Sequence, residues 1–125
     1  MPTLTQAPNL GDLLKYEAPN LYSREQATVA AGQNLPLGAV VGIDAATGKL
    51  KALDPTASDG SEVAVGVLAL AVDATLIDRE DAILIARHAI VARHALVWPV
   101  GITAAQKLAA IAQIEAHGIL VRDSA

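Results

Sequence analysis

The chain has 125 residues, the usual size of one domain, and just over half of them are apolar. Phe is absent, Trp occurs once and Tyr twice, and Ala alone makes up about a fifth of the chain. The net charge of −4 argues against a nucleic-acid partner, because phosphate binding needs clustered Lys and Arg. Without cysteine, disulfides and thiolate chemistry are excluded. Small side chains bury little area each, so we expect a thin core that gains from contacts with other subunits.

Two features bear on where the protein is located. The N-terminus lacks the succession of basic, apolar and small residues that marks a secretory signal. No apolar run reaches the roughly 18 residues of a membrane-spanning helix. We therefore expect a soluble protein, made in the cytoplasm and without a membrane partner.

Residues 1–26 differ in composition from the rest of the chain. Pro2, Pro8 and Pro19 each remove a backbone donor and disfavour helix in the residue before them. We predict an extended N-terminal arm over residues 1–26 and a compact β domain over residues 27–125. The arm is either a frayed terminus or a segment that orders on a partner, for example by adding a strand to an exposed sheet edge.

The first part of the compact domain is expected to be β-structure with tight turns. Short strands are predicted over 27–30, 37–43 and 49–54. The connection 44–48 is typical of a hairpin loop, since it ends in Gly48, which suits the left-handed position.

A Val-rich segment over residues 63–72 is predicted to be the central strand. It follows a turn that contains Pro55 and Gly60, and its continuous apolar character is typical of a strand buried on both faces. Its single Gly66 is expected to mark a bend.

The charged segment 76–81 is expected to be a solvated loop. Its carboxylates could in principle attract a hard cation, but their spacing does not match a calcium loop.

Two of the three histidines lie in a short internal repeat, Ala-Arg-His-Ala at 86–89 and again at 92–95. A zinc site needs three or four convergent ligands, and His117 falls on a separate predicted helix. A histidine base would need a nucleophile, and no serine or cysteine motif accompanies these residues. We therefore expect His88 and His94 to be exposed or interfacial strand residues, and we predict no catalytic residue, no cofactor-binding residue and no metal ligand.

The C-terminal part contains the one convincing helix, predicted over about 103–117. Thr103 with Gln106 three residues later forms a capping-box pattern, and Gly118 suits the C-terminal cap. A short strand over 119–122 is expected to follow. Before the helix, Trp98-Pro99 is a stiff pair, and a lone Trp is either a core residue or a contact with another subunit.

Several short motifs follow one another along the chain. They are Thr28-Val29-Ala30 with Gly32, Leu37-Gly38-Ala39-Val40-Val41-Gly42, Ala52-Leu53-Asp54-Pro55, Asp59-Gly60, Ala64-Val65-Gly66-Val67-Leu68, Ala71-Val72-Asp73-Ala74-Thr75, Leu96-Val97-Trp98-Pro99, Ile102-Thr103, Gln106-Lys107 and Gly118-Ile119. In this order and spacing they resemble the head decoration protein D family of lambda-like tailed bacteriophages. The similarity covers roughly residues 24–122, most of the chain.

This resemblance implies a structural virion protein, a cement protein and not an enzyme. The implied fold is mainly β (α+β), of the β-clip type with little helix. The family forms homotrimers on the outer surface of the expanded phage head, at its local threefold positions, and reinforces the shell against the pressure of packaged DNA.

The implied partner is the major capsid protein, whose strands pair with the N-terminal arm. On this basis we predict capsid contacts at Leu13, Leu14, Tyr16, Leu21 and Tyr22. Trp98 and Pro99 are predicted to lie at the trimer interface. Deletion of residues 1–22 is expected to leave a soluble trimer that no longer holds the capsid.

Two other functions stay open. One is a different β-rich trimeric virion component, such as a tail or spike protein, which placement away from the threefold sites would reveal. The other is a nucleotide hydrolase on a β-clip scaffold, which needs a pocket with convergent carboxylates, and no motif in the sequence indicates one.

Overall fold

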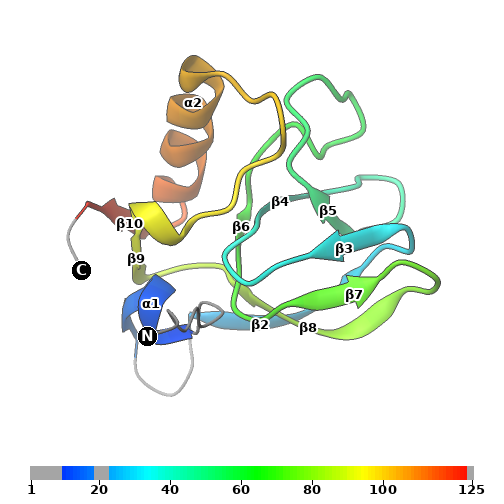
Figure 1. Cartoon of the computed structure of the whole chain (residues 1–125), viewed down its shortest axis with the longest axis horizontal. Coiled ribbons are helices and arrows are strands. Elements are labelled where there is room, and N and C mark those ends of the chain that lie inside the picture. Colours follow the sequence, from blue (N-terminus) through cyan, green and yellow to red (C-terminus); the bar gives the residue numbers. More distant parts are fainter. Residues whose placement is uncertain (1–9, 19–22, 124–125) are drawn as a thin grey trace, which may run out of the picture.

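The computed structural model describes residues 10–18 and 23–123 (Figure 1). Strands account for most of the regular structure in these ranges, and they form three sheets. The predicted mainly β organisation with one long helix is confirmed. Within these ranges no helix has both the length and the apolar character needed to cross a membrane.

Five strands close into a small barrel in the order β2-β5-β4-β6-β8. They are Arg24–Val29 (β2), Val40–Ile43 (β4), Leu50–Ala52 (β5), Gly66–Leu68 (β6) and Arg79–Ile85 (β8). The antiparallel pair β2–β8 is the longest, whereas β2 and β5 run parallel. A separate antiparallel pair joins β3 (Gln33–Leu35) to β7 (Val72–Ala74). Small and branched side chains from both groups of strands share one core, as expected for a chain without Phe.

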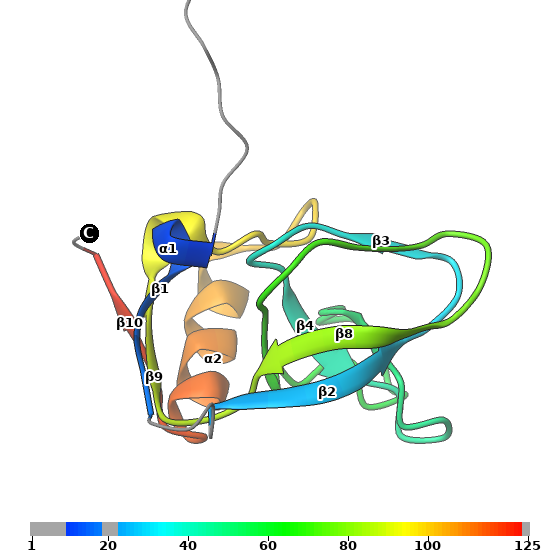
Figure 2. The same cartoon turned by 90° about the horizontal axis from the view of Figure 1, so that it is seen from below.

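A second layer lies at one end of the barrel (Figures 1 and 2). Its three-stranded sheet has β9 (Ala89–Ala92) in the middle, with β1 (Leu14–Glu17) antiparallel on one side and β10 (Ile119–Arg122) parallel on the other. Helix α2 (Ala104–Glu115) packs against β10. The four-residue helix α1 (Leu10–Leu13) precedes β1, and a 3₁₀ turn, η2 (Arg93–Ala95), follows β9.

Two local predictions are confirmed in detail. Helix α2 begins after Thr103, whose hydroxyl accepts from the Gln106 N–H at 3.1 Å while the Gln106 side chain accepts from the Thr103 N–H at 2.9 Å. The connection 44–48 joins β4 to β5 as a hairpin, and Gly48 has a φ of 72°. In both places the signal is short-range, so sequence spacing alone was sufficient.

The predicted central strand over 63–72 is wrong as a continuous element. β6 ends at Leu68, and the chain changes direction before β7, which pairs with β3 outside the barrel. Val63 is exposed and precedes β6. The continuous apolar character arises because two short strands in different sheets are both buried, which periodicity cannot distinguish from one long strand.

The internal repeat around the two histidines does not lie on one strand. The first copy falls where β8 ends and the chain turns, and His88 has a left-handed φ of 49°. The second copy begins at the end of β9 and continues into η2, which contains His94. Both histidines are exposed, as predicted, but neither lies in a strand, so the predicted strand position is wrong.

Candidate interaction surfaces

Part of the predicted N-terminal arm packs against the body of the protein. We call residues 10–17, which form α1 and β1, the N-terminal clasp. Leu13 is only 1% exposed and belongs to the same core cluster as Val91 of β9. Leu14 is partly buried against that cluster, whereas Tyr16 is 51% exposed. The clasp is therefore held by one deeply buried anchor and presents an exposed aromatic ring.

Buried polar contacts fix the chain just beyond the clasp. The fully buried Ser23 hydroxyl donates to the His88 carbonyl oxygen at 2.8 Å and accepts from the Ala18 N–H at 2.9 Å. Arg24 forms two hydrogen bonds to the Glu17 carboxylate, at 2.7 and 2.8 Å, and this pairing raises the pKa of Arg24. The end of β1 and the start of β2 are thus tied to each other and to the β8–β9 turn.

The five predicted capsid contacts fall into different environments. Leu21 and Tyr22 lie outside the described residues. Tyr16 is available at the surface, and β1 is an edge strand of its sheet, a position that can accept another strand. Leu13 is buried, so a contact through Leu13 requires the clasp to leave β9. The set of contacts stays a prediction, with Tyr16 and the β1 edge as its accessible part.

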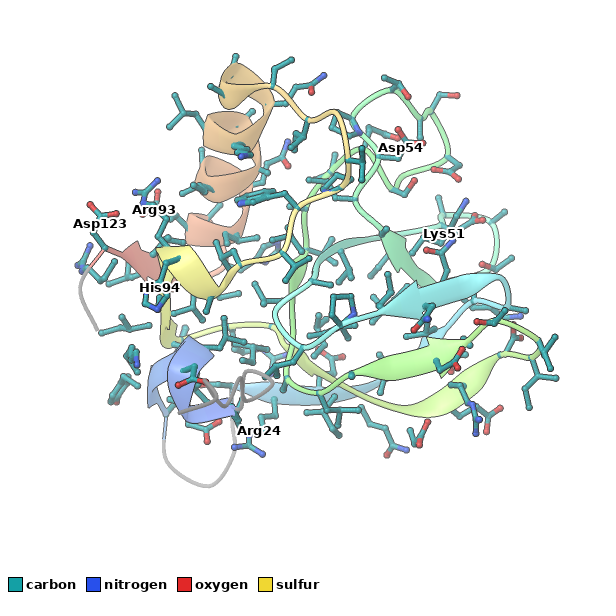
Figure 3. The ribbon with its side chains drawn as sticks, viewed as in Figure 1. Arg24, Lys51, Asp54, Arg93, His94 and Asp123 are labelled. Carbon is teal, nitrogen blue, oxygen red and sulfur yellow. The ribbon has the colours of Figure 1, made fainter. Side chains whose placement is uncertain are left out.

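An apolar groove of about 490 Å³ lies between η2, the segment that follows it and α2. Its lining includes Leu96, Trp98, Leu108 and Ile111, with Arg93, His94 and Lys107 beside them. Leu108 is 65% exposed, so the groove is open to solvent. Figure 3 shows Arg93 and Asp123 close together at this end of the molecule, where they form an ion pair of 2.6 Å.

Trp98 is partly buried and partly open to the surface. It packs against the core cluster that contains Leu13 and Val91, and it also lines the groove. Its neighbours Val97 and Val100 are exposed apolar residues, and Pro99 lines the adjoining cleft. The Trp98-Pro99 segment therefore lies within an exposed apolar region, as a subunit contact would require, and its place in a trimer interface stays a prediction.

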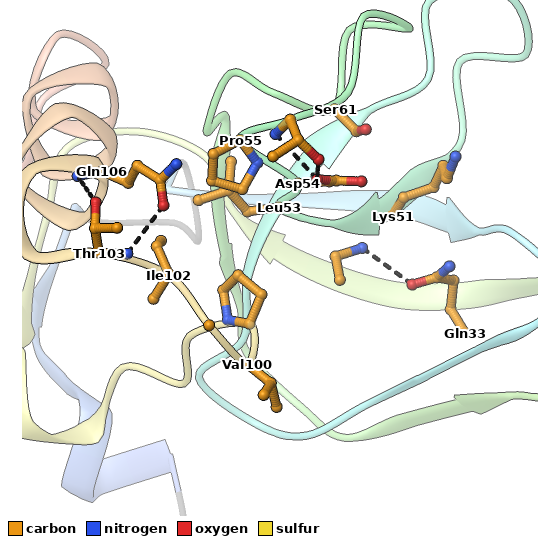
Figure 4. A pocket seen from close by; sticks show the side chains of 14 residues that line it. Gln33, Lys51, Leu53, Asp54, Pro55, Ser61, Val100, Ile102, Thr103 and Gln106 are labelled. Carbon is orange, nitrogen blue, oxygen red and sulfur yellow. Dashed lines mark hydrogen bonds between the residues drawn. The ribbon is translucent and has the colours of Figure 1, made fainter.

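The cleft beside Pro99 has a volume of about 600 Å³ and a polar lining (Figure 4). Among the described residues, Asp54 is the only carboxylate that lines it, and its Oδ1 accepts from the Thr56 N–H and hydroxyl. The other hydrogen bonds drawn there are internal ones, such as the capping box and the bond from the Ala52 N–H to Gln33. A nucleotide hydrolase needs convergent carboxylates, and this cleft offers a single one. In residues 10–18 and 23–123, no three His, Asp or Glu side chains cluster as a metal site would require.

The sequence did not single out the apolar tip at the opposite end of the molecule. In the connection between β7 and β8, Leu76 is 88% exposed and Ile77 is 62% exposed. The segment 76–81 was predicted to be a solvated loop because of its charges. It is on the surface, but residues 79–81 belong to strand β8, so the loop prediction is wrong for them. The signal that could have identified the tip is that two large aliphatic residues, Leu76 and Ile77, stand next to four charged residues in a segment expected at the surface.

Two aspartate–lysine ion pairs stabilise loops around the barrel. Asp59 accepts from Lys51 at 2.9 Å and from the Ser61 hydroxyl at 2.6 Å, and these hydrogen bonds hold the pKa of Asp59 well below its ordinary value of 3.8. Lys49 and the Ala31 N–H bind Asp78 and lower its pKa in the same way. These carboxylates stabilise loops, so their shifted pKa values have a structural cause.

No curated protein was found to match this chain. A family model, that of the bacteriophage lambda head decoration protein D, matches residues 3–119, which is nearly the whole sequence. The match includes the barrel, β1, β9 and α2 and ends at Ile119, the first residue of β10, so it concerns nearly the whole fold and not one motif. The chain therefore belongs to the bacteriophage lambda head decoration protein D family, a family of structural proteins of the phage capsid and not a class of enzymes.

Proposed function

We propose that this protein binds as a homotrimer to the outer surface of the expanded phage capsid at its threefold sites, and that it stabilises the shell against the pressure of packaged DNA. The observation that carries the proposal is the family match over residues 3–119. The exposed apolar region around Trp98 and Pro99 supports subunit contacts, and the β1 edge supports strand addition by the capsid protein.

The stabilisation would follow from mass action. A ligand that binds only the expanded shell lowers the free energy of that state, by an amount that grows with ligand concentration and affinity. Three copies of the N-terminal segment on one trimer would bind together, so that weak individual contacts give strong attachment. Leu13, Leu14, Tyr16, Leu21 and Tyr22 are the proposed capsid contacts, and Trp98 and Pro99 the proposed trimer contacts.

Co-sedimentation with DNA-free shells of the cognate phage tests the proposal. Binding is expected on expanded shells, saturating at three chains per threefold site, and not on unexpanded shells. The expanded shells should then withstand a higher temperature or denaturant concentration when decorated. Absence of binding to either shell, with folded protein, would refute the proposal, and binding to tails instead would establish a tail component.

A further inference from the structure

We propose that neighbouring copies of this chain join head to tail, with the apolar tip Leu76–Ile77 of one copy seated in the groove around Trp98 and Leu108 of the next. This inference deepens the proposed function and rests on its homotrimer. It names the two surfaces that meet at each subunit junction, one of which includes Trp98.

The tip is a preformed projection. The Asp73 carboxylate accepts from the Thr75 N–H at 3.1 Å, and the Asp73 carbonyl oxygen accepts from Arg79 Nε at 3.1 Å, which closes the base of the loop. On the other side Asp78 is held by the Ala31 N–H at 2.7 Å. The exposed side chains of Leu76 and Ile77 thus stand on a braced loop, and a braced loop loses little conformational entropy when it binds.

The groove matches the tip in its apolar character. It is a concave, mostly apolar site of about 490 Å³ that combines an aromatic ring with aliphatic side chains. Trp is enriched among the residues that contribute most to protein–protein binding, and these residues cluster near the centre of an interface. The groove and the tip each leave apolar surface in water that the other would cover.

The charges around the two surfaces are also complementary. Glu80 and Asp81, next to the tip, are exposed and form no ion pair with any residue that the structure describes. At the groove, Lys107 likewise has no carboxylate partner in the described part of the chain, while Arg93 is paired with Asp123. A junction would bring the unpaired carboxylates of one copy near the unpaired ammonium group of the next, which favours this pairing over tip-to-tip or groove-to-groove contact.

The positions of the two surfaces determine the kind of assembly. Figures 1 and 2 show the β7–β8 connection at one end of the long axis, with η2 and α2 toward the other end. A contact between different surfaces of identical subunits is heterologous, and it closes into a ring when the rotation between copies divides a full turn. A rotation of one third of a turn gives the proposed trimer, with three equal junctions.

Sedimentation equilibrium on purified variants tests the junction. The tip variant Leu76→Ser/Ile77→Ser and the groove variant Leu108→Glu are each expected to raise the concentration for half-association about 100-fold or more. Val63→Ser is the matched control, because Val63 is also an exposed apolar residue and lies on neither surface. Circular dichroism and thermal unfolding should show that all three variants keep the native fold.

Mixing the two defective variants gives a sharper result. The tip variant keeps an intact groove and the groove variant keeps an intact tip, so a mixture should form a single junction. It should sediment as a one-to-one dimer at concentrations where each variant alone is monomeric. A Lys107→Glu variant should also dissociate, and adding Glu80→Lys and Asp81→Lys to it should restore the wild-type assembly.

The outcomes separate this inference from the proposed function. If the wild-type protein sediments as a trimer and the tip and groove variants also remain trimers, the proposed junction is wrong and the proposed trimer stands. Wild-type protein that is monomeric at all concentrations overturns both. Loss of shell binding in a variant that is still trimeric bears on the capsid contact alone.

Discussion

Gly66 lies where β6 meets β8 in the barrel. A Cβ added there would lie 2.4 Å from the Ile85 carbonyl oxygen and 2.8 Å from Leu84 Cδ1, distances too short for any side chain. Gly48 differs, because no atom of the described residues, apart from its chain neighbours, lies within 4 Å of its added Cβ, and only its φ of 72° resists substitution.

We expect Gly66→Ala to lower the free energy of unfolding by about 3 kcal/mol or more, because the two strands must separate. Gly48→Ala should cost about 1 kcal/mol, the strain of a left-handed Ala. Urea unfolding of both variants measures the difference. Equal losses would mean that the barrel widens at β6 at little cost.

Asp59 is expected to contribute to stability in a pH-dependent way. Its pKa is lowered in the folded protein, first by the hydrogen bond from Lys51 and then by those from Ser61. The folded state therefore binds the proton less readily than the unfolded state. The stabilisation is complete above the ordinary pKa of 3.8 and is lost as the pH falls below it.

Urea unfolding between pH 7 and pH 2 tests this expectation. Asp59→Asn should be less stable than wild type at pH 7 and should lose less additional stability on acidification. Lys51→Met keeps the Ser61 hydrogen bonds and should show an intermediate slope. Identical acid slopes in all three proteins would assign the acid sensitivity to other groups.

Among the elements, the N-terminal clasp contains two predicted capsid contacts, Leu13 and Tyr16, that differ in burial. Leu13→Ala should lower the free energy of unfolding by about 2–5 kcal/mol, because it empties a buried site under β9. Tyr16→Ala should change stability by no more than about 0.5 kcal/mol, since the ring is half exposed. If the proposed capsid contact is correct, Tyr16→Ala should nevertheless weaken binding to expanded shells.

Denaturant unfolding and shell co-sedimentation of the two variants provide the comparison. The clasp also changes the expectation for deletions, because removing residues 1–22 would remove Leu13 and β1 from the body. Full stability of Leu13→Ala would show that the clasp is detached in solution.

The elements that the sequence predicted well are those specified by near neighbours. The capping box at Thr103 and the hairpin at Gly48 each depend on residues within four positions. The single strand predicted over 63–72 was wrong because the division of this segment into β6 and β7 depends on distant partners. β6 pairs with β4 and β8, whereas β7 pairs with β3. Pairing over such separations leaves no local trace in an apolar run.

At the scale of the whole molecule, assembly should control attachment to the shell. A tip variant that is monomeric presents one intact N-terminal segment, whereas a trimer presents three. We expect its apparent affinity for expanded shells to fall at least about 100-fold, although its own clasp is unchanged.

Co-sedimentation at a series of protein concentrations measures this loss, with Val63→Ser as the control that stays trimeric. Undiminished binding of the monomer would show that single-chain contacts suffice and that trimerisation is not needed for attachment.

The general role in the capsid could be inferred from the order of short motifs, whereas the two surfaces of the proposed junction could not. The tip and the groove-lining residues are separated along the sequence and lie at opposite ends of the fold. Their complementarity becomes visible only once β7 and β8 project the tip and α2 packs beside η2.

The middle strand of the three-stranded sheet has one further consequence. Leu14, at the start of β1, and Val121, near the end of β10, both lie opposite Val91 of β9. Two strand spacings separate them, about 10 Å. The described chain from residue 10 to residue 123 therefore begins and ends beside the same strand, so its strand pairs do not require the present order of the chain. A circular permutant with a linker from residue 123 to residue 10 and new termini in the exposed hairpin at Thr47 would keep every strand pair described here.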